Sequence, residues 1–431
     1  MKKVLALSFL TAGFFLNAQS IGNSPYAAFG IGDIKYDNST EISFMGGIST
    51  AYISDFNGSF NFSNPAANRN LTLTSFRVEA TNENNMFKSN YNDIKSTKSS
   101  TYLSNISLAF PISEKVKFGM GYQPYSSKSY EITRFDDLGN DVVRGNNFSG
   151  DGTVNLVQAA ASYIVNDNLT FGVRANYLFG KLTDKNELVY SNAELVNGHE
   201  TTTKIKNFNF TLGSTYRLTT ANDRLLTFGA TATLGNTSDM NTKYVNSTYY
   251  YSNTVKTNEN IIHQTEEKSK NLLPFQASLG VGYGNENRWF GSAQVDYKKG
   301  EKIMYVGKPF EYNDSYRATV GGWILPNYNN FRSYFSRVVY RFGAYYEKGA
   351  LNLTSNGLTN AGGKNINEFG LTAGATFPFK NSSITRMSGL DLGFEVGKRG
   401  TLQNNLINQT FFNLKIGVNF ADKWFNKKLY N

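Results

Sequence analysis

The sequence predicts an all-β protein: a fourteen-stranded antiparallel transmembrane β-barrel with an N-terminal hatch segment inside it. Three observations support this prediction. Segments in which bulky apolar residues alternate with small or polar ones recur along the chain, the connections between them alternate between short and long, and the chain begins with an export signal.

Composition agrees with strands rather than helices. Of the 431 residues 15% are aromatic, Gly is abundant at 39 and Pro is scarce at 8, a mixture that favours twisted antiparallel strands with aromatic girdles. Cysteine is absent, which excludes disulfides and thiolate metal sites. The two histidines, His199 and His263, lie in polar stretches without ligand spacing. We therefore expect no metal and no cofactor.

Residues 1–18 are typical of a signal peptide. Lys2 and Lys3 form its basic start, residues 4–16 its apolar core, and Ala18 the small residue before cleavage. Beyond this segment the sequence has no apolar run of about 18 residues. Any membrane crossing must then use strands.

The stretch NLTFGVRANYLFG at 168–180 illustrates the strand pattern. Phe171, Val173 and Tyr177 alternate with Gly172 and Arg174, so one face is apolar and the other polar. The fourteen predicted strands lie at 76–80, 102–110, 115–123, 152–165, 168–180, 208–218, 226–234, 275–283, 289–297, 316–324, 338–346, 369–377, 390–396 and 410–420.

The connections carry a second signal. Short turns such as PISE and ND alternate with long loops, of which 82–101, 134–151, 181–202 and 236–271 are the clearest. Outer-membrane barrels show this asymmetry because short turns face the periplasm and long loops face outside. Stacked sandwich domains have no reason to keep it.

The polar face of the strands indicates what lies inside. Gly229, Thr231 and Gly280, among others, are too small to fill a dry core at native density. The apolar face is therefore expected to meet lipid and the polar face a wet or plugged lumen. The acids Asp391 and Glu395 are expected to balance inward arginines, namely Arg174, Arg217, Arg317 and Arg341.

Enzymatic activity is not expected. A barrel hydrolase needs a Ser/His pair near strand ends, but neither histidine lies on a predicted strand and no G-x-S-x-G occurs. GVGYG at 280–284 lies within a predicted strand with no helix after it, so it does not bind nucleotide.

Residues 19–70 precede the first strand. A structureless segment of this length is unusual in a compact protein, so we expect it to pack inside the barrel as a hatch; a flexible periplasmic tail is the alternative. The predicted organisation is then signal peptide 1–18, hatch 19–70, barrel 71–420 and a periplasmic C-terminal extension at 421–431.

Motifs in this segment resemble a known family. Met45, Gly46 and Gly47 are followed by Ala51, Asp55 and the triplet Asn64-Pro65-Ala66. This combination resembles the FadL-type outer-membrane transporters of hydrophobic compounds, and residues 150–180 resemble the family's fourth and fifth strands. The stretches GGWILPNY, VVYRFGAYYEKG and FADKWFNKK resemble the versions of the family found in Bacteroidetes. The resemblance implies a signal peptide, a hatch bearing the NPA motif, and fourteen strands.

The resemblance also implies an activity: passive uptake of small hydrophobic compounds such as long-chain fatty acids across the outer membrane of a Gram-negative cell. In the family, ligands descend to a pocket above the hatch and leave sideways at a kinked third strand. Here that strand carries Gly121 and Pro124. Because proline cannot donate to a ladder, it marks either a lateral exit or a position beyond the paired part of the strand.

The outer loops leave a second function open. Tyr244, Tyr249, Tyr250 and Tyr251 are candidate ligand contacts, yet their loop has few aliphatic residues. Such tyrosines also grip protein or sugar surfaces. The resemblance itself implies the alternative, because members of this barrel family in Bacteroidetes also serve as partners in secretion or outer-membrane assembly: a non-transporting partner or docking subunit of a Bacteroidetes protein-secretion or outer-membrane assembly complex. Expected partners are outer-membrane lipid and lipopolysaccharide, a hydrophobic small molecule, or secretion or assembly proteins, and no nucleic acid.

Overall fold

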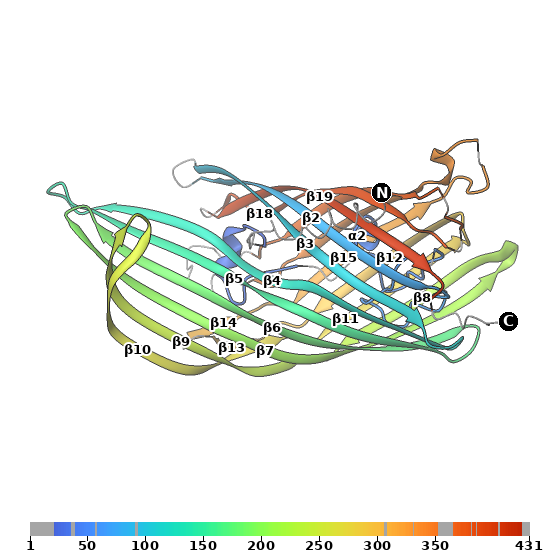
Figure 1. Ribbon diagram of the computed structural model, residues 1–431, viewed down its shortest axis with the longest axis horizontal. Coiled ribbons are helices and arrows are strands. Elements are labelled where there is room, and N and C mark those ends of the chain that lie inside the picture. Colours follow the sequence, from blue (N-terminus) through green and yellow to red (C-terminus); the bar gives the residue numbers. More distant parts are fainter. Residues whose placement is uncertain are drawn as a thin grey trace, which may run out of the picture.

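Fourteen antiparallel strands close into one barrel, because the last strand pairs with the first along its whole length. The computed structural model describes residues 21–35, 39–56, 58–90, 94–305, 308–330, 332–351, 365–380, 382–384, 386–403 and 406–424 (Figure 1). The barrel strands are β2 (Thr74–Ser89), β3 (Ile94–Pro111), β4 (Val116–Asp137), β5 (Val143–Ile164), β6 (Leu169–Tyr190), β7 (Ala193–Thr220), β8 (Arg224–Thr233), β11 (Gln276–Asn285), β12 (Trp289–Lys298), β15 (Ser315–Ile324), β16 (Val339–Lys348), β17 (Glu368–Pro378), β18 (Gly389–Gly400) and β19 (Ile407–Asp422). The predicted closed antiparallel barrel and its count of fourteen strands are confirmed.

One half of the barrel is a short band. β8, β11, β12, β15 and β16 each have 10 residues and β17 has 11, a length that suits a tilted strand crossing a bilayer. Their outward side chains are apolar and exposed, as at Leu279, Val295 and Val320. The rings of Tyr297 and Tyr316 lie 5.2 Å apart at one end of this band.

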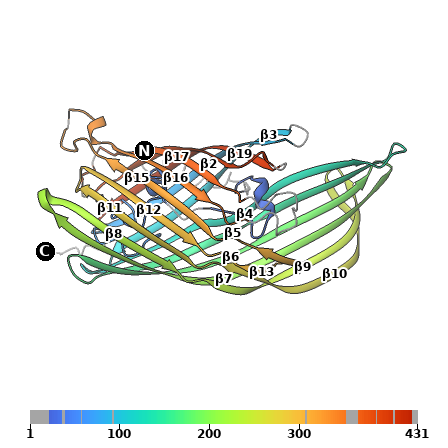
Figure 2. The ribbon, with the colours of Figure 1, turned by 180° about the vertical axis from the view of Figure 1, so that it is seen from behind.

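The other half rises far beyond the band. β4, β5 and β6 each have 22 residues and β7 has 28. β9 (Asn236–Ser252) pairs with the upper part of β7, and β10 (Val255–Leu273) pairs with β9. We call this tall curved sheet, residues 128–152, 182–203 and 236–273, the crest; Figures 1 and 2 show it extending past the short strands.

The crest corrects the prediction of long loops. Segments 134–151, 181–202 and 236–271 are strand pairs joined by tight turns, and 82–101 is mostly the upper part of β2 and β3. These segments stand outside the apolar band, so polar residues are found on both of their faces. Apolar alternation is therefore missing, although the backbone pairs as in any ladder.

The remaining elements are small. They are η2 (Pro25–Ala28), β1 (Asp33–Ile34), α2 (Thr40–Ser43), η4 (Ala221–Asp223), the hairpin β13 (Lys302–Tyr305) with β14 (Lys308–Glu311), and η5 (Phe335–Arg337). Among the described residues, no helix is long and apolar enough to cross a membrane. The predicted signal peptide and residues 425–431 of the predicted C-terminal extension lie outside the described residues.

Candidate functional site

The interior of the barrel is occupied by residues 39–56 and 58–72, which we call the inner segment. Met45, Ile48, Ala51 and Asn64 have no exposed surface. The apolar part of the inner segment packs with the barrel wall: the ring of Phe56 lies 4.9 Å from that of Trp323. This segment therefore has a core of its own inside the barrel.

The Met45-Gly46-Gly47 motif makes a tight turn after α2. Gly46 and Gly47 have φ values of +76° and +101°, a region that side-chain-bearing residues rarely adopt. The Gly46 N–H donates to Thr372 Oγ1 at 2.9 Å, and Arg317 Nη2 donates to the Gly46 carbonyl at 3.1 Å. The motif is thereby held against β15 and β17.

The Asn64-Pro65-Ala66 motif lies against β6 and β7. Asn64 Nδ2 donates to the carbonyls of Thr50 at 2.6 Å and Ser214 at 3.3 Å, and Asn64 Oδ1 accepts from the Ala66 N–H at 3.0 Å. The asparagine thus joins two parts of the inner segment to the barrel wall. The two motifs that carry the family resemblance lie on different sides of the lumen.

Inward glycines provide the space for the inner segment. A Cβ added at Gly172 would collide with the backbone of Pro65, one at Gly229 with the Thr50 carbonyl, and one at Gly343 with Met45. The small inward residues that indicate a wet or plugged lumen are therefore contact points for a second piece of backbone. The alternation of residues along each strand shows that the inward residues are small, but it does not show that they contact the inner segment.

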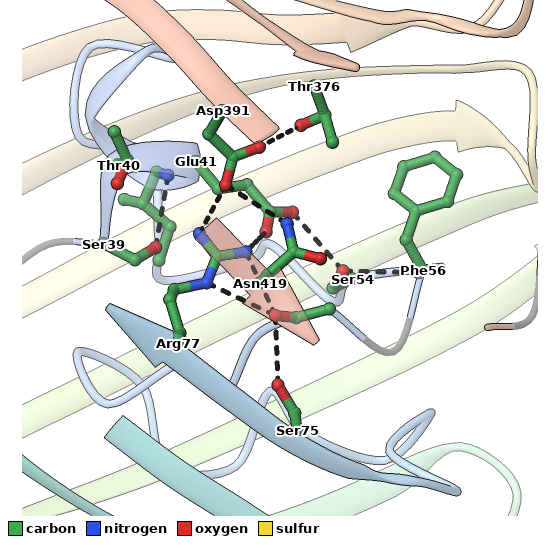
Figure 3. A network of polar contacts seen from close by, with 12 residues as sticks. Ser39, Thr40, Glu41, Ser54, Phe56, Ser75, Arg77, Thr376, Asp391 and Asn419 are labelled. Atoms are coloured by element: carbon green, nitrogen blue, oxygen red, sulfur yellow. Dashed lines mark hydrogen bonds and ion pairs between the residues drawn. The ribbon is translucent and has the colours of Figure 1, made fainter. Parts of the chain in front are cut away.

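A buried cluster of charges ties α2 to three barrel strands, and Figure 3 shows its part around Arg77, Glu41 and Asp391. Arg77 of β2 contacts Glu41 of α2 at 3.1 Å, Glu79 at 2.9 Å and Asp391 of β18 at 3.1 Å. Arg341 of β16 contacts Glu41 at 3.2 Å. All of these side chains are at least 97% buried, so each charge depends on the others for its solvation.

The direct ion-pair partners of Asp391 and Glu395 differ from the expected ones, although the expected Arg341 and Arg317 also interact electrostatically with Asp391 and Glu395, respectively. Asp391 pairs directly with Arg77, and Glu395 pairs with Lys415 at 3.0 Å. Glu41 and Arg77 were not predicted as partners from the sequence, although Arg77 and Glu79 stand two residues apart on the polar face of a predicted strand. That spacing places both side chains in the lumen; nothing in it identifies α2 as the third partner.

The pKa values of two carboxyl groups of the inner segment are shifted in opposite directions. Burial acts to raise the pKa of Glu41, but Arg341 and Arg77 outweigh it and hold the pKa at about 2. Burial raises the pKa of Asp55 to about 6, although the Asn287 N–H donates to its carboxylate at 3.0 Å. Glu41 is thus charged throughout the neutral range, whereas Asp55 loses its charge under mildly acidic conditions.

Above the inner segment lie two adjoining cavities of about 230 and 170 Å³. The larger is lined by ionisable side chains of both signs, among them Lys35, Lys298, Arg317, Arg399, Lys415, Asp33, Glu83, Glu347, Glu368 and Glu395. The smaller has an apolar wall of Tyr125, Leu156, Leu178 and Leu273. The lumen is therefore mainly a charged space with one apolar side.

The barrel wall is interrupted between β3 and β4. Their ladder ends at Ile106 and Tyr122, while β4 continues to pair with β5 up to Asp137 with a register shift between Pro124 and Ser126. Gly121 lies in the paired part, opposite Ser107. Pro124 is therefore beyond the β3 ladder and still opposite β5.

Residues 21–35, which we call the strap, cover this interruption from inside. β1 pairs with the free edge of β4, with Asp33 opposite Ser127 and Ile34 opposite Ser126. On the other side, Lys35 contacts Glu83 of β2 at 2.8 Å. The strap thus joins the two sides of the wall where β3 and β4 separate.

The four candidate tyrosines do not form one site. All lie on β9, where alternate residues face opposite sides of the sheet. Tyr249 and Tyr251 both donate to Glu187 Oε1 at 2.5 Å. Tyr244 and Tyr250 point to the other face, and the Tyr244 hydroxyl lies 2.5 Å from His199 Nδ1.

This closed barrel, with an inner segment and an interrupted wall next to its third strand, has the fold of the FadL-type channels. A Pseudomonas aeruginosa FadL homologue superposes with a TM-score of 0.61 at 12% identity, covering 91% of this chain and 100% of that one. The Ralstonia pickettii toluene transporter TbuX gives 0.58 at 14%, covering 92% and 99%. The Pseudomonas putida toluene transporter TodX gives 0.58 at 15%, covering 92% and 100%.

The sequence matches the model of a family with a different name from these structural neighbours. The BamG family model matches residues 1–431, and the chain belongs to the BamG family. No curated protein matches it.

Gly172→Ala is expected to destabilise the barrel by about 1 to 3 kcal/mol, because the new methyl group overlaps the Pro65 backbone. Limited proteolysis of the inner segment and heat-dependent unfolding in detergent measure the effect. Gly291→Ala is the matched control, since a Cβ there meets nothing within 4 Å. Equal protease resistance of the two variants would contradict the packing described.

Glu41→Gln is expected to cost about 3 to 5 kcal/mol, because it removes the carboxylate that Arg77 and Arg341 share. With the pKa lowered from 4.5 to about 2 on folding, the ion pairs stabilise the protein above pH 4.5, and this contribution of about 3 kcal/mol is lost as the pH falls toward 2. Unfolding measured against pH should lose that part of its acid dependence in the variant. Glu114→Gln, at an exposed turn, is the control; an unchanged pH profile in Glu41→Gln would refute the assignment.

Proposed function

We propose that the protein is an outer-membrane barrel that serves as a docking subunit in a protein-secretion or outer-membrane assembly complex. The crest carries this proposal. It is a broad sheet on one side of the barrel, and it stands beyond the ten-residue band that would lie in the membrane.

The outer-membrane location rests on the exterior of the barrel. Apolar side chains such as Leu279 and Val320 are exposed on the short strands, and aromatic residues lie toward the band ends. In water this surface would aggregate, whereas in a bilayer it is the expected lipid-facing band. The inner segment would act as the hatch of this barrel.

The lumen is poorly suited to a hydrophobic passage. The inner segment is held by buried ion pairs to β2, β16 and β18, so moving it would expose charges that have no other solvation. The larger cavity above it is lined by charged groups. An alkyl chain crossing such a space would displace the water and partners of those charges.

The crest, by contrast, offers surface that a protein partner could bury. Its two outer edges are β10 and the part of β4 beyond Ser127. Within the described residues, no further strand pairs with β4 beyond Ser127, and the β13–β14 hairpin lies near β10 without forming a ladder with it. At one edge, Phe135 on β4 is 71% exposed. At the other edge, the consecutive residues Ile261 and Ile262 on β10 are 52% and 56% exposed. Apolar side chains next to unpaired backbone are typical of sites where a partner strand adds to a sheet.

The test is purification from native outer membranes in mild detergent. A stoichiometric protein partner should accompany the unaltered chain and be lost with Phe135→Asp combined with Ile262→Asp, because the new carboxylates cannot be buried at an interface. Asn241→Asp, also exposed on the crest, is the control and should keep the partner. Retention of the partner by the double variant, or a chain that purifies alone, would refute docking.

Passive uptake of small hydrophobic compounds is the second candidate, and one observation favours it. The smaller cavity, with its apolar wall of Tyr125, Leu156, Leu178 and Leu273, adjoins the interruption between β3 and β4. A compound in this cavity would leave sideways once the strap moved. Solved structures with this fold include toluene transporters. The smaller cavity, of about 170 Å³, suits an apolar compound of the size of toluene.

Uptake is tested by fixing the strap in place. Ile34→Cys with Ser126→Cys joins directly opposite residues of β1 and β4, and the chain has no other cysteine. In oxidised cells, uptake of toluene and of a labelled long-chain fatty acid should fall and then recover on reduction. Ile106→Cys with Tyr122→Cys crosslinks strands that are already paired and should leave uptake unchanged. Normal uptake with the strap crosslinked would exclude a lateral exit here.

A further inference from the structure

Three lysines form a compact group on the outer surface of β6 and β7, at the level where the apolar band ends. On β6 the outward residues run from Phe171 through Tyr177 and Phe179 to Lys181, and on β7 from Leu212 through Phe210 and Phe208 to Lys206 and Lys204. Phe179 stands opposite Lys206, and Lys181 stands opposite Lys204. All three lysine side chains are exposed.

This pairing is unfavourable without an anion. Directly opposed residues on one face of an antiparallel pair have Cβ atoms about 5 Å apart, and like charges in that position destabilise a sheet. Lys181 and Lys204 are opposed in this way, and Lys206 is the next residue on the same face. Lys181, Lys204 and Lys206 thus share one small area of the outer wall.

The neighbouring strands β9 and β10 carry further lysines near this group. Asn241 of β9 stands opposite Lys204 and next to Lys268 of β10, while Lys243 stands opposite Thr202. Thr183 and Thr202, directly opposed across β6 and β7, add two hydroxyl groups just beyond the lysines. Acids also face this side: Asp151 of β5 stands opposite Thr183, two residues along from Thr153, which is opposite Lys181. Glu200 lies 3.7 Å from Lys185, and Glu266 stands opposite Lys243. None of these acids stands directly opposite Lys181, Lys204 or Lys206.

The position of the three lysines along β6 and β7, relative to the end of the apolar band, indicates which ligand they would meet. One step of two residues along a strand is about 7 Å, so Lys181 begins about 7 Å beyond Phe179. The polar headgroup layer of a bilayer is of that thickness, since headgroups add roughly 5 to 8 Å on each side of the hydrocarbon core. Lysines there would lie level with the phosphate groups of outer-leaflet lipid.

We propose that Lys181, Lys204 and Lys206 form a binding site for phosphate monoester groups of outer-leaflet lipid. Lysine ammonium groups are strongly attracted to phosphate as point charges. The site binds lipid beneath the crest and would thereby hold the tall side of the barrel upright in the membrane. It depends on the membrane location proposed above and is independent of whether the barrel docks a partner or transports a compound.

The experiment uses the full chain in phosphatidylcholine vesicles that contain bisphosphorylated lipid A. The triple variant Lys181→Gln, Lys204→Gln, Lys206→Gln should bind lipid A about 100-fold more weakly, because each lysine at an anionic surface contributes roughly a factor of five. Native mass spectrometry of the released protein measures the bound lipid A, and heat-dependent gel mobility confirms that both proteins are folded barrels.

The matched control is Lys115→Gln, Lys380→Gln, Lys423→Gln, which removes the same charge at the opposite, short-turn end of the barrel. It should retain lipid A at the unaltered level. Equal retention by the first triple variant would overturn the proposal, and so would protection of the three lysines from acetylation by a copurified protein instead of lipid. Displacement of lipid A by inorganic phosphate at equal phosphate concentration would overturn the assignment to lipid.

Discussion

The structure depends on the close approach between the backbone of the inner segment and the inward glycines of the barrel. Two pieces of backbone can lie this close only where side chains are missing, as at Gly172, Gly229 and Gly343. The barrel therefore lacks bulky residues where an isolated barrel would need them to fill its lumen. Its interior is complete only when the inner segment is in place.

Buried ion pairs also hold the inner segment in place, in addition to this packing. Glu41 enters the wall between Arg77 and Arg341, and the Tyr52 hydroxyl donates to the same carboxylate. Each group would be costly to bury alone, but together they satisfy one another. Position and orientation of the inner segment are thereby fixed by directional contacts in addition to shape.

The sequence predicted the strands best where their two faces meet different surroundings. In 168–180 the alternation of Phe171 and Val173 with Gly172 and Arg174 reflects the exposed outer surface on one side and the interior with the inner segment on the other. The crest escaped prediction because both its faces are largely polar, and the β9–β10 hairpin has no apolar period to reveal it. Once β9 is known to be a strand, the separation of Tyr249 from Tyr250 follows directly from its period of two.

Contacts between distant parts of the chain could not be predicted in the same way. Glu41 and Arg77 are 36 residues apart, and Asp33 contacts Arg399 across 366 residues. No spacing rule links such residues, because their meeting depends on where the closed barrel places each strand. The strap was missed for this reason: its partners on β2, β4 and β18 come together only after closure.

The closing ladder between β19 and β2 has a consequence for the order of assembly. The inner segment contacts strands all round the wall, from β6 and β7 at Asn64 to β15 and β17 at Gly46. A finished cylinder of fourteen strands would have to admit this chain through an end, past its charged interior. The inner segment precedes every strand of the cylinder in the chain, so the wall can instead be wrapped around it, and sealing the last strand onto the first is the step that encloses it.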